Sequence, residues 1–175
     1  MELAHVYDQR SKITQLENGL PVPNTLNFDN YSRICFDGTI FAALNKKFNF
    51  FTGLQVGINF TNKTNQLNDF LIGGINGIYR NQVRFAGLQE ATLHSPSVAA
   101  LQLGLRYNPI NNVYLIGRVN GLVKDFAINT SASTGLTGYA LTFAYRTPIG
   151  PLELSAMYSD QSKRLQSYVL FGITF

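Results

Sequence analysis

Hydrophobic and polar side chains alternate along most of the chain. In the last stretch, RLQSYVLFGITF at residues 164–175, one face carries Leu165, Ser167, Val169, Phe171, Ile173 and Phe175. Successive side chains of a β-strand point to opposite faces, so this period of two predicts a strand with one apolar face. Because that face continues to Phe175, we expect it to contact something large, either a protein core or a lipid bilayer.

The same alternation recurs in several segments, and each is predicted to be a strand. The segments are 32–44, 48–60, 70–75, 98–107, 113–122, 137–146, 152–159 and 164–175. Ordinary strands have about 5–6 residues, whereas a tilted membrane-spanning strand needs about 9–11, and the clearest segment, 48–60, exceeds both. The sequence predicts no helix of useful length. The predicted fold class is therefore all-β, with about eight antiparallel, meandering strands.

The connections between these segments differ in character. Residues 1–30 include ENGLPVPNTLNFDN, which is rich in Asn, Pro and Gly and predicts a linker or a periplasmic segment. Residues 31–175 form the predicted barrel domain. Within it, residues 76–97 and the polar stretch KDFAINTSASTGL form two long connections, and the other connections are short turns.

The composition of the two faces indicates which one is wet. Charged residues make up only 14% of the chain, below the ~25% of typical soluble domains, and aromatic residues gather at strand ends, as in the girdles of outer-membrane barrels. Lipid is thus expected outside, against Leu101, Leu103, Leu105, Leu141, Phe143, Leu152, Leu154, Val169 and Phe171. Water is expected inside, against Gln102, Arg106, Arg118, Asn120, Arg146 and Glu153. A soluble barrel or sandwich is the alternative to this transmembrane β-barrel.

Loop lengths give an expected orientation. If Phe175 lies at the periplasmic rim, counting back places TPIGP, NPINN and NKTNQLND on the periplasmic side. DQSKR, KDFAINTSASTGL, residues 76–97 and NKK then lie outside. Both long loops are external in this arrangement, as expected for an outer-membrane barrel.

Little in the sequence points to chemistry. The net charge of +4 is scattered over the chain, so we expect no nucleic-acid partner. Cys35 is the only cysteine, which excludes a disulfide within the chain. The two histidines, His5 and His94, are not in a catalytic motif, and the acidic residues lack metal-ligand spacing. We therefore expect neither a cofactor nor an enzymatic activity in this chain.

Four stretches resemble one known family: FLIGG at 70–74, YRNQVRFAG at 79–87, YRTPIGPLELSAMYS at 145–159, and the last strand. They are similar to the C-terminal half of the BamA-like outer-membrane barrels, also called bacterial surface antigen barrels. Within that group, the chain resembles the barrel of patatin-like phospholipases. The resemblance covers residues 31–175.

The resemblance implies several features. The family has a loop that folds into the lumen with an Arg-Gly-aromatic tip, which suggests Arg84, Phe85 and Gly87 as the lumen loop, although this chain reads Arg84-Phe85-Ala86-Gly87. Phe171, Ile173 and Phe175 would be the signal read by the outer-membrane barrel-assembly machinery. A patatin-type hydrolase, if present, would lie on a domain outside this chain. The localisation implied is the bacterial outer membrane, with its lipids as partners.

The family barrel has sixteen strands, and this chain supplies about eight. The strands therefore either close on themselves or form half of a larger barrel. The polar inward set favours the larger, water-filled barrel, completed by an N-terminal half outside this chain or by a second copy. Three functions remain open: a translocation or pore domain, a plain eight-stranded anchor or adhesin barrel, and a soluble lipid-carrying barrel.

Overall fold

The computed structural model describes side chains for residues 32–60, 68–127 and 133–172, and the backbone of residues 2–6, 9–17, 20–28 and 31 as well. Described residues are almost entirely strands, turns and loops, and none of them forms a helix long and apolar enough to cross a membrane. The predicted all-β fold is confirmed.

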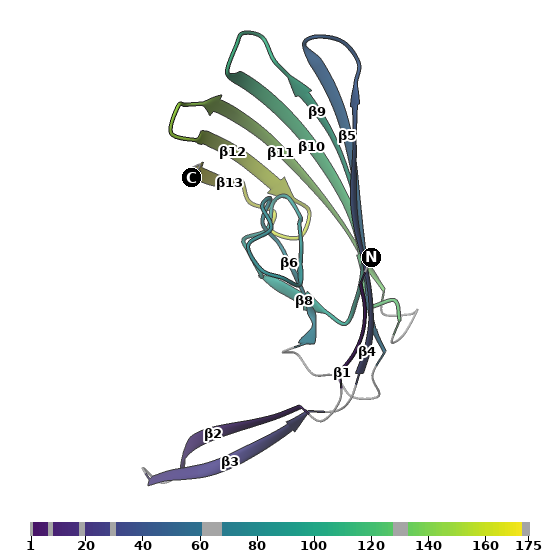
Figure 1. Ribbon diagram of the computed structural model, residues 1–175, viewed down its shortest axis with the longest axis vertical. Coiled ribbons are helices and arrows are strands. Elements are labelled where there is room, and N and C mark those ends of the chain that lie inside the picture. The colour runs from purple at the N-terminus through teal and green to yellow at the C-terminus, as the bar shows by residue number, and fades with distance from the viewer. Residues whose placement is uncertain are drawn as a thin grey trace.

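One curved sheet dominates the fold (Figure 1). Its eight strands follow the order β1 (Glu2–Val6), β4 (Tyr31–Ala43), β5 (Phe48–Phe60), β9 (Ser97–Tyr107), β10 (Val113–Lys124), β11 (Thr134–Arg146), β12 (Pro151–Ser159) and β13 (Gln166–Phe171). All neighbouring pairs are antiparallel. We call this sheet the wall.

Two smaller sheets complete the topology. One pairs β2 (Gln9–Glu17) with β3 (Leu20–Phe28). The other contains β6 (Phe70–Ile72), β7 (Gln82–Val83) and β8 (Leu93–Ser95), with β6 in the centre. The β6–β7 pair is parallel and the β6–β8 pair is antiparallel. This three-stranded sheet lies on the concave side of the wall (Figure 1).

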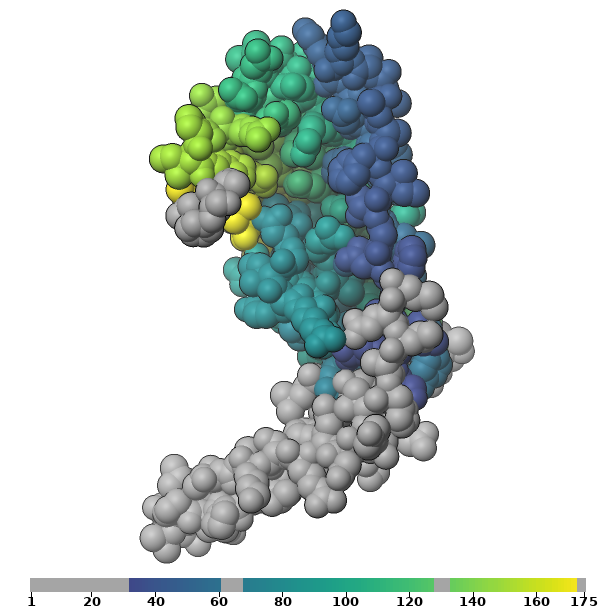
Figure 2. Space-filling view, in the orientation of Figure 1, coloured from purple at the N-terminus to yellow at the C-terminus, as the bar shows by residue number. Residues whose placement is uncertain are grey.

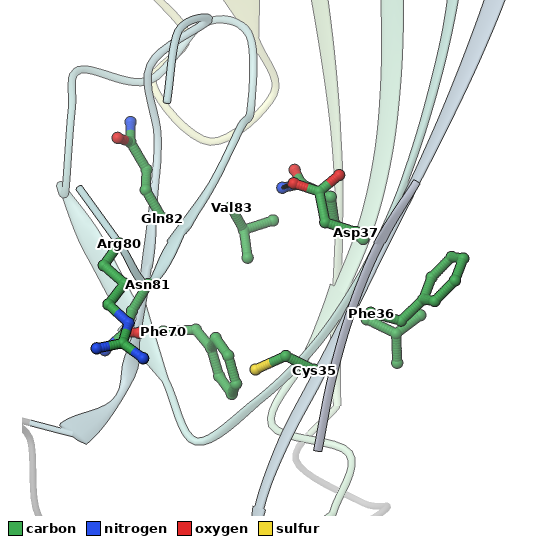
Figure 3. A pocket seen from close by; sticks show the side chains of 11 residues that line it. Cys35, Phe36, Asp37, Phe70, Arg80, Asn81, Gln82 and Val83 are labelled. Carbon is green, nitrogen blue, oxygen red and sulfur yellow. Dashed lines mark hydrogen bonds between the residues drawn. The ribbon is translucent and has the colours of Figure 1, made fainter. Parts of the chain in front are cut away.

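The two faces of the wall differ as the alternation predicted. On the convex face, large apolar side chains are exposed, among them Leu101, Leu103, Leu105, Leu141, Phe143, Leu154, Val169 and Phe171, and Leu152 is half-buried. Figure 3 shows the alternation on β4, where Phe36 points away from the concave side while Cys35 and Asp37 point toward it. The concave face combines small and polar residues with buried apolar ones such as Val98, Leu122 and Met157.

Two predictions about segments were wrong. Residues 70–75 were predicted as a wall strand, but Phe70–Ile72 belongs to the small sheet. No strand was predicted before residue 32, yet β1 adds to the wall beside β4, and β2 and β3 form a pair of their own. The domain boundary at residue 30 stays a prediction. The strand β1 precedes that boundary and nevertheless pairs with β4 of the wall.

The strand topology also changes the predicted orientation of two connections. Since β6 is not in the wall, the whole connection from β5 to β9 leaves and rejoins the wall at one end. Asn68 and Asp69, the described part of NKTNQLND, belong to the connection that returns at the same end as residues 76–97, and the rest of NKTNQLND lies outside the described residues. The NKK turn lies at the opposite end, with NPINN and TPIGP. We call these the long-loop end and the short-turn end. The placement predicted for NKK, and for the described residues Asn68 and Asp69, is wrong relative to the other loops.

Within the described strands the wall is an open sheet with β1 and β13 as its edges. Directions alternate through the eight strands, so β1 and β13 run in opposite directions. An even number of strands leaves edges that can join in the antiparallel manner of outer-membrane barrels.

Candidate functional site

The connection between β5 and β9 folds back onto the concave face of the wall. We call its described part, residues 68–96, the docked loop. Backbone pairing of Phe70 with Ser95 and of Leu71 with Gln82 holds it in one compact unit. In the space-filling view this teal loop lies against the blue strands β4 and β5 (Figure 2). Connections of this length are uncommon in compact domains, where most connections have only a few residues.

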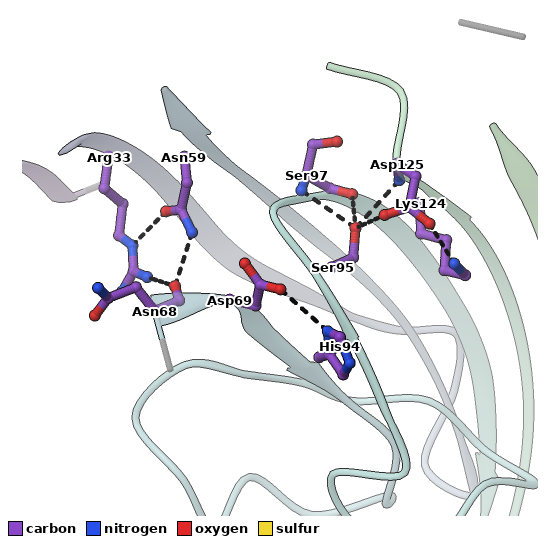
Figure 4. Close-up of polar contacts among 9 residues, drawn as sticks. All are labelled: Arg33, Asn59, Asn68, Asp69, His94, Ser95, Ser97, Lys124 and Asp125. Carbon is purple, nitrogen blue, oxygen red and sulfur yellow. Dashed lines mark hydrogen bonds and ion pairs between the residues drawn. The ribbon is translucent and has the colours of Figure 1, made fainter. Parts of the chain in front are cut away.

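A buried arginine fastens the loop to the wall at the long-loop end (Figure 4). Arg33 on β4 is 7% exposed. Its guanidinium donates to Asn59 Oδ1 at 2.8 Å, to Asn81 Oδ1 at 2.9 Å and to the carbonyl of Asn68. It also lies 4.9 Å from the centre of the Phe70 ring. One side chain thus joins two wall strands to two parts of the loop, and its charge is held by hydrogen bonds and an aromatic face.

A second polar cluster holds the other end of the loop (Figure 4). His94 Nδ1 lies 3.1 Å from Oδ2 of the buried Asp69. The hydroxyl of Ser95 is 2.7 Å from Asp125 Oδ1 and accepts a bond from the Asp125 backbone N–H. These contacts fix β8 to β6 and to the end of β10. The loop is therefore anchored on both sides of its sheet.

Two adjacent glycines shape the turn after β6. Gly73 and Gly74 have φ values of +131° and +76°, which residues other than glycine rarely adopt. A Cβ on Gly73 would lie 2.0 Å from the carbonyl oxygen of Gln89. Gln82 Nε2 donates to the Gly73 carbonyl at 2.5 Å, and the Phe85 N–H donates to the Gly74 carbonyl at 2.8 Å. The Gly-Gly pair thus lets the chain turn and bring Phe85 back beside β6.

Apolar side chains fill the space between loop and wall, and Phe85, with no exposed surface, is among those at the centre. The cluster joins Phe70, Ile72, Val83, Phe85 and Leu88 of the loop to Val98, Ala100, Leu122 and Leu136 of the wall. Full burial of each large side chain contributes about 1.5–3 kcal/mol. The loop is therefore held by a hydrophobic core as well as by its polar anchors.

Glycines on both surfaces allow this close approach. A Cβ on Gly57 would lie 2.4 Å from the Phe70 ring, and one on Gly138 would lie 2.1 Å from the Ala86 carbonyl oxygen. Gly87, in the loop, would meet the Tyr158 backbone at 2.3 Å. Recurrent glycine on the inner face therefore marks where other groups approach the backbone.

Arg84, Phe85 and Gly87, the predicted lumen-loop residues, all lie where the loop meets the wall. Arg84 Nη2 is 3.0 Å from Asp37 Oδ1 on β4. The Arg84 backbone N–H donates to Gln55 Oε1 at 2.9 Å, and Gln55 Nε2 donates to Asp37 Oδ2 at 2.9 Å. The tip of the loop is thus tied to two strands by an ion pair and a bridging amide. The functional role of these residues stays a prediction.

A cavity of about 240 Å³ remains beside this contact (Figure 3). Its lining combines Cys35, Asp37, Gln55 and Gly57 of the wall with Phe70 and residues 80–83 of the loop. No group of three or more His, Cys, Asp or Glu side chains in the described ranges could hold a metal ion.

The six polar residues predicted to face the lumen, Gln102, Arg106, Arg118, Asn120, Arg146 and Glu153, alternate with the convex apolar residues along β9 to β12. Asn120 is 1% exposed, and neither side-chain amide atom has a hydrogen-bond partner among the described residues. Arg106 and Arg146 are exposed, and the others are half-buried. The structure brings Arg118 near Arg106, Arg84 and Glu153, within electrostatic range.

Of the predicted assembly signal, only Phe171 falls within the described residues. Phe171 is 53% exposed on edge strand β13. Ile173 and Phe175 lie outside the described residues. The signal role of all three remains a prediction.

Sequence reasoning missed four residues that hold the loop: Arg33, Asp37, Gln55 and Asn59. They form two cross-strand pairs, Arg33 opposite Asn59 and Asp37 opposite Gln55. Both pairs follow from the register of the β4–β5 hairpin, which the NKK turn closes. Counting outward from that turn along the two predicted strands could therefore have identified these residues.

Comparisons with known proteins identify the family. A family model described as the OMP85 superfamily matches residues 18–175. No curated protein and no solved structure matches the chain. Members of this superfamily are outer-membrane barrel proteins with translocation-type roles, which agrees with the resemblance to BamA-like barrels and with the antiparallel wall. The chain belongs to the OMP85 superfamily.

Proposed function

We propose that this chain forms part of the wall of an outer-membrane barrel that acts as a translocation or pore unit, with the docked loop narrowing its lumen. The observation that carries the proposal is the contrast between the two faces of the wall. The convex face exposes a continuous set of large apolar side chains, and the concave face holds a folded loop through apolar, hydrogen-bonded and ionic contacts.

The size of the loop favours a barrel of more than eight strands. The interior of an eight-stranded barrel is just wide enough for its own side chains to fill. Here the concave face also accommodates a three-stranded sheet with its own buried residues. The opposite directions of β1 and β13 allow either an N-terminal half outside this chain or a second copy to complete the barrel. Exposed strand edges do not occur in lipid, so a wall that does not close on itself needs one of these partners.

The remaining partners follow from this placement. The lipids of the bacterial outer membrane would contact the convex face, and the barrel-assembly machinery would read the last strand. Any patatin-like hydrolase would belong to a separate domain.

Two alternatives make different predictions. An anchor or adhesin barrel would have no conducting lumen. A soluble lipid carrier needs an apolar cavity on the concave side, and the exposed apolar residues of the wall on the convex side weigh against it.

Conductance across planar bilayers tests the proposal. We expect the membrane-extracted full chain, in its assembled form, to give small, stable channels because the docked loop narrows the lumen. Phe85→Ala should give larger or more variable conductance, since it removes the buried centre of the loop contact. The matched control is Ile78→Ala, which truncates a loop residue that is 59% exposed. Absence of conductance in every variant would favour the anchor, and partition into buffer without detergent would favour the lipid carrier.

A further inference from the structure

Three arginines occupy the concave wall between the docked loop and the short-turn end. Arg106 lies near the end of β9, Arg118 in the middle of β10, and Arg146 at the end of β11. Arg118 and Arg106 are diagonal neighbours, because Arg106 is opposite Ile116 in the β9–β10 register. We call these three residues the arginine belt.

None of the three guanidinium groups has a carboxylate within ion-pair distance in the part of the chain that the structure describes. Arg118 Nη1 donates to the neutral hydroxyl of Thr142 at 2.9 Å. The Arg106 guanidinium lies 5.2 Å from the centre of the Tyr114 ring. Both contacts orient the side chains without neutralising their charge.

The charges around the belt leave it positive. Arg84 and Asp37 offset each other in an ion pair. Glu153 is the acidic residue that interacts electrostatically with Arg118, and the positive charges of Arg106 and Arg84 also act on Arg118. Among the described residues, one carboxylate, that of Glu153, thus acts on Arg118 against the positive charges of Arg106 and Arg84.

Charged side chains at membrane depth are costly unless they face a water-filled cavity or a partner, and they commonly mark ion or substrate pathways. Rings of arginine or lysine select anions in pores. We propose that the arginine belt is an anion-binding constriction, which gives the lumen a preference for small anions such as chloride and inorganic phosphate. This inference rests on the proposed pore, since it requires a water-filled lumen.

The reversal potential under a potassium chloride gradient measures this preference. We expect the unmodified protein to favour chloride. Removing one positive charge a few ångströms from the ion path should lower the chloride-to-potassium permeability ratio by at least about threefold. Arg118→Gln and Arg106→Gln should both lower it, and Glu153→Gln should raise it. Opposite shifts from arginine and glutamate variants would not follow from a merely structural role.

Arg164→Gln is the matched control, because it removes the same charge from an exposed turn at the long-loop end. It should leave the ratio unchanged. Channels without anion preference in the unmodified protein, or equal shifts from Arg164→Gln and Arg118→Gln, would overturn the inference while leaving the pore intact.

A second measurement decides the inference if the protein does not conduct. Inorganic phosphate is titrated into the assembled protein in detergent, and the side-chain Nε–Hε resonance of Arg118 is followed by NMR. A saturable shift that is lost in Arg106→Gln supports an anion site even if the pore proposal fails. A linear, non-saturating shift overturns it.

Discussion

The two ends of the concave wall face different surroundings, although the same strands form both. Toward the long-loop end, β9 to β12 place apolar or small residues under the docked loop: Val98, Ala100, Leu122, Leu136, Gly138 and Met157. There β4 and β5 add the hydrogen-bonded anchors Arg33 and Asn59. Toward the short-turn end, the inner face also carries polar or charged residues that the apolar loop core does not cover: Gln102, Arg106, Arg118, Thr142, Arg146 and Glu153. They lie among buried apolar residues of the wall itself, Phe51, Ile116 and Ala144.

This comparison shows that the inner residues of the wall determine where the loop docks. The alternation of inside and outside is the same along each strand, because it depends only on the pleat. What changes is the chemistry of the inner positions. Unpaired charges under a dry loop would cost several kcal/mol each, whereas apolar side chains there contribute to docking. The boundary between the two compositions marks where the loop ends.

The largest effect is expected from Phe85→Ala, which removes a buried side chain between the docked loop and the long-loop end of the wall. Phe85 has no exposed surface, and truncating a buried phenylalanine costs about 3–5 kcal/mol. The loop should detach and become sensitive to protease while the wall stays folded. Limited proteolysis and urea unfolding in detergent measure the two effects separately. Protection equal to that of the Ile78→Ala variant would contradict the assigned core.

Neighbouring residues on β9 test the faces themselves. Leu103→Arg should cost about 2–4 kcal/mol if the convex face meets the bilayer midplane. Gln102→Arg, one residue away on the concave face, should cost much less because its charge can reach water. Unfolding from lipid vesicles compares them. Equal costs, or a larger cost for Gln102→Arg, would reverse the inside and outside of the wall.

The wall could be predicted from the sequence, and the loop could not. Alternation over eight or more residues is specific, so seven of the eight predicted strand segments, such as 48–60 for β5, correspond to wall strands. Residues 70–75 also look like a strand, and three of them are one. A short apolar run does not reveal which sheet it joins, and Phe70 packs on the wall instead of extending it.

Some residues of the candidate site could likewise be predicted from the sequence, and others could not. The resemblance to a family located the loop tip, and alternation located the inner polar residues. The anchors Arg33 and Asn59 escaped because their pairing depends on strand register and on a loop that returns from far along the chain. The strand β1 escaped because it is short and follows no alternation of its own that would identify it.

A smaller effect should come from the close backbone approach at β11. A Cβ on Gly138 would lie 2.1 Å from the Ala86 carbonyl oxygen, so the loop backbone must shift. Overpacking of this kind costs about 1–3 kcal/mol. Gly138→Ala should therefore increase protease access to the loop. Gly135→Ala is the control on the same strand, since its Cβ would meet nothing within 4 Å. Similar protease access in the two variants would show that the approach is not tight.

The smallest effect is expected where the two ends meet, at the ion pair between Arg84 and Asp37. The two side chains are 29% and 57% exposed, and exposed ion pairs contribute about 0.2–1 kcal/mol. Asp37→Asn, Arg84→Gln and the double variant form a cycle that isolates this contribution from the bond that the Arg84 backbone makes to Gln55. The coupling should fall as salt rises, because solvent screens the pair. A coupling that is independent of salt would mean that Arg84 holds the loop through its shape and hydrogen bonds, so the boundary between the covered and open ends would depend on packing alone.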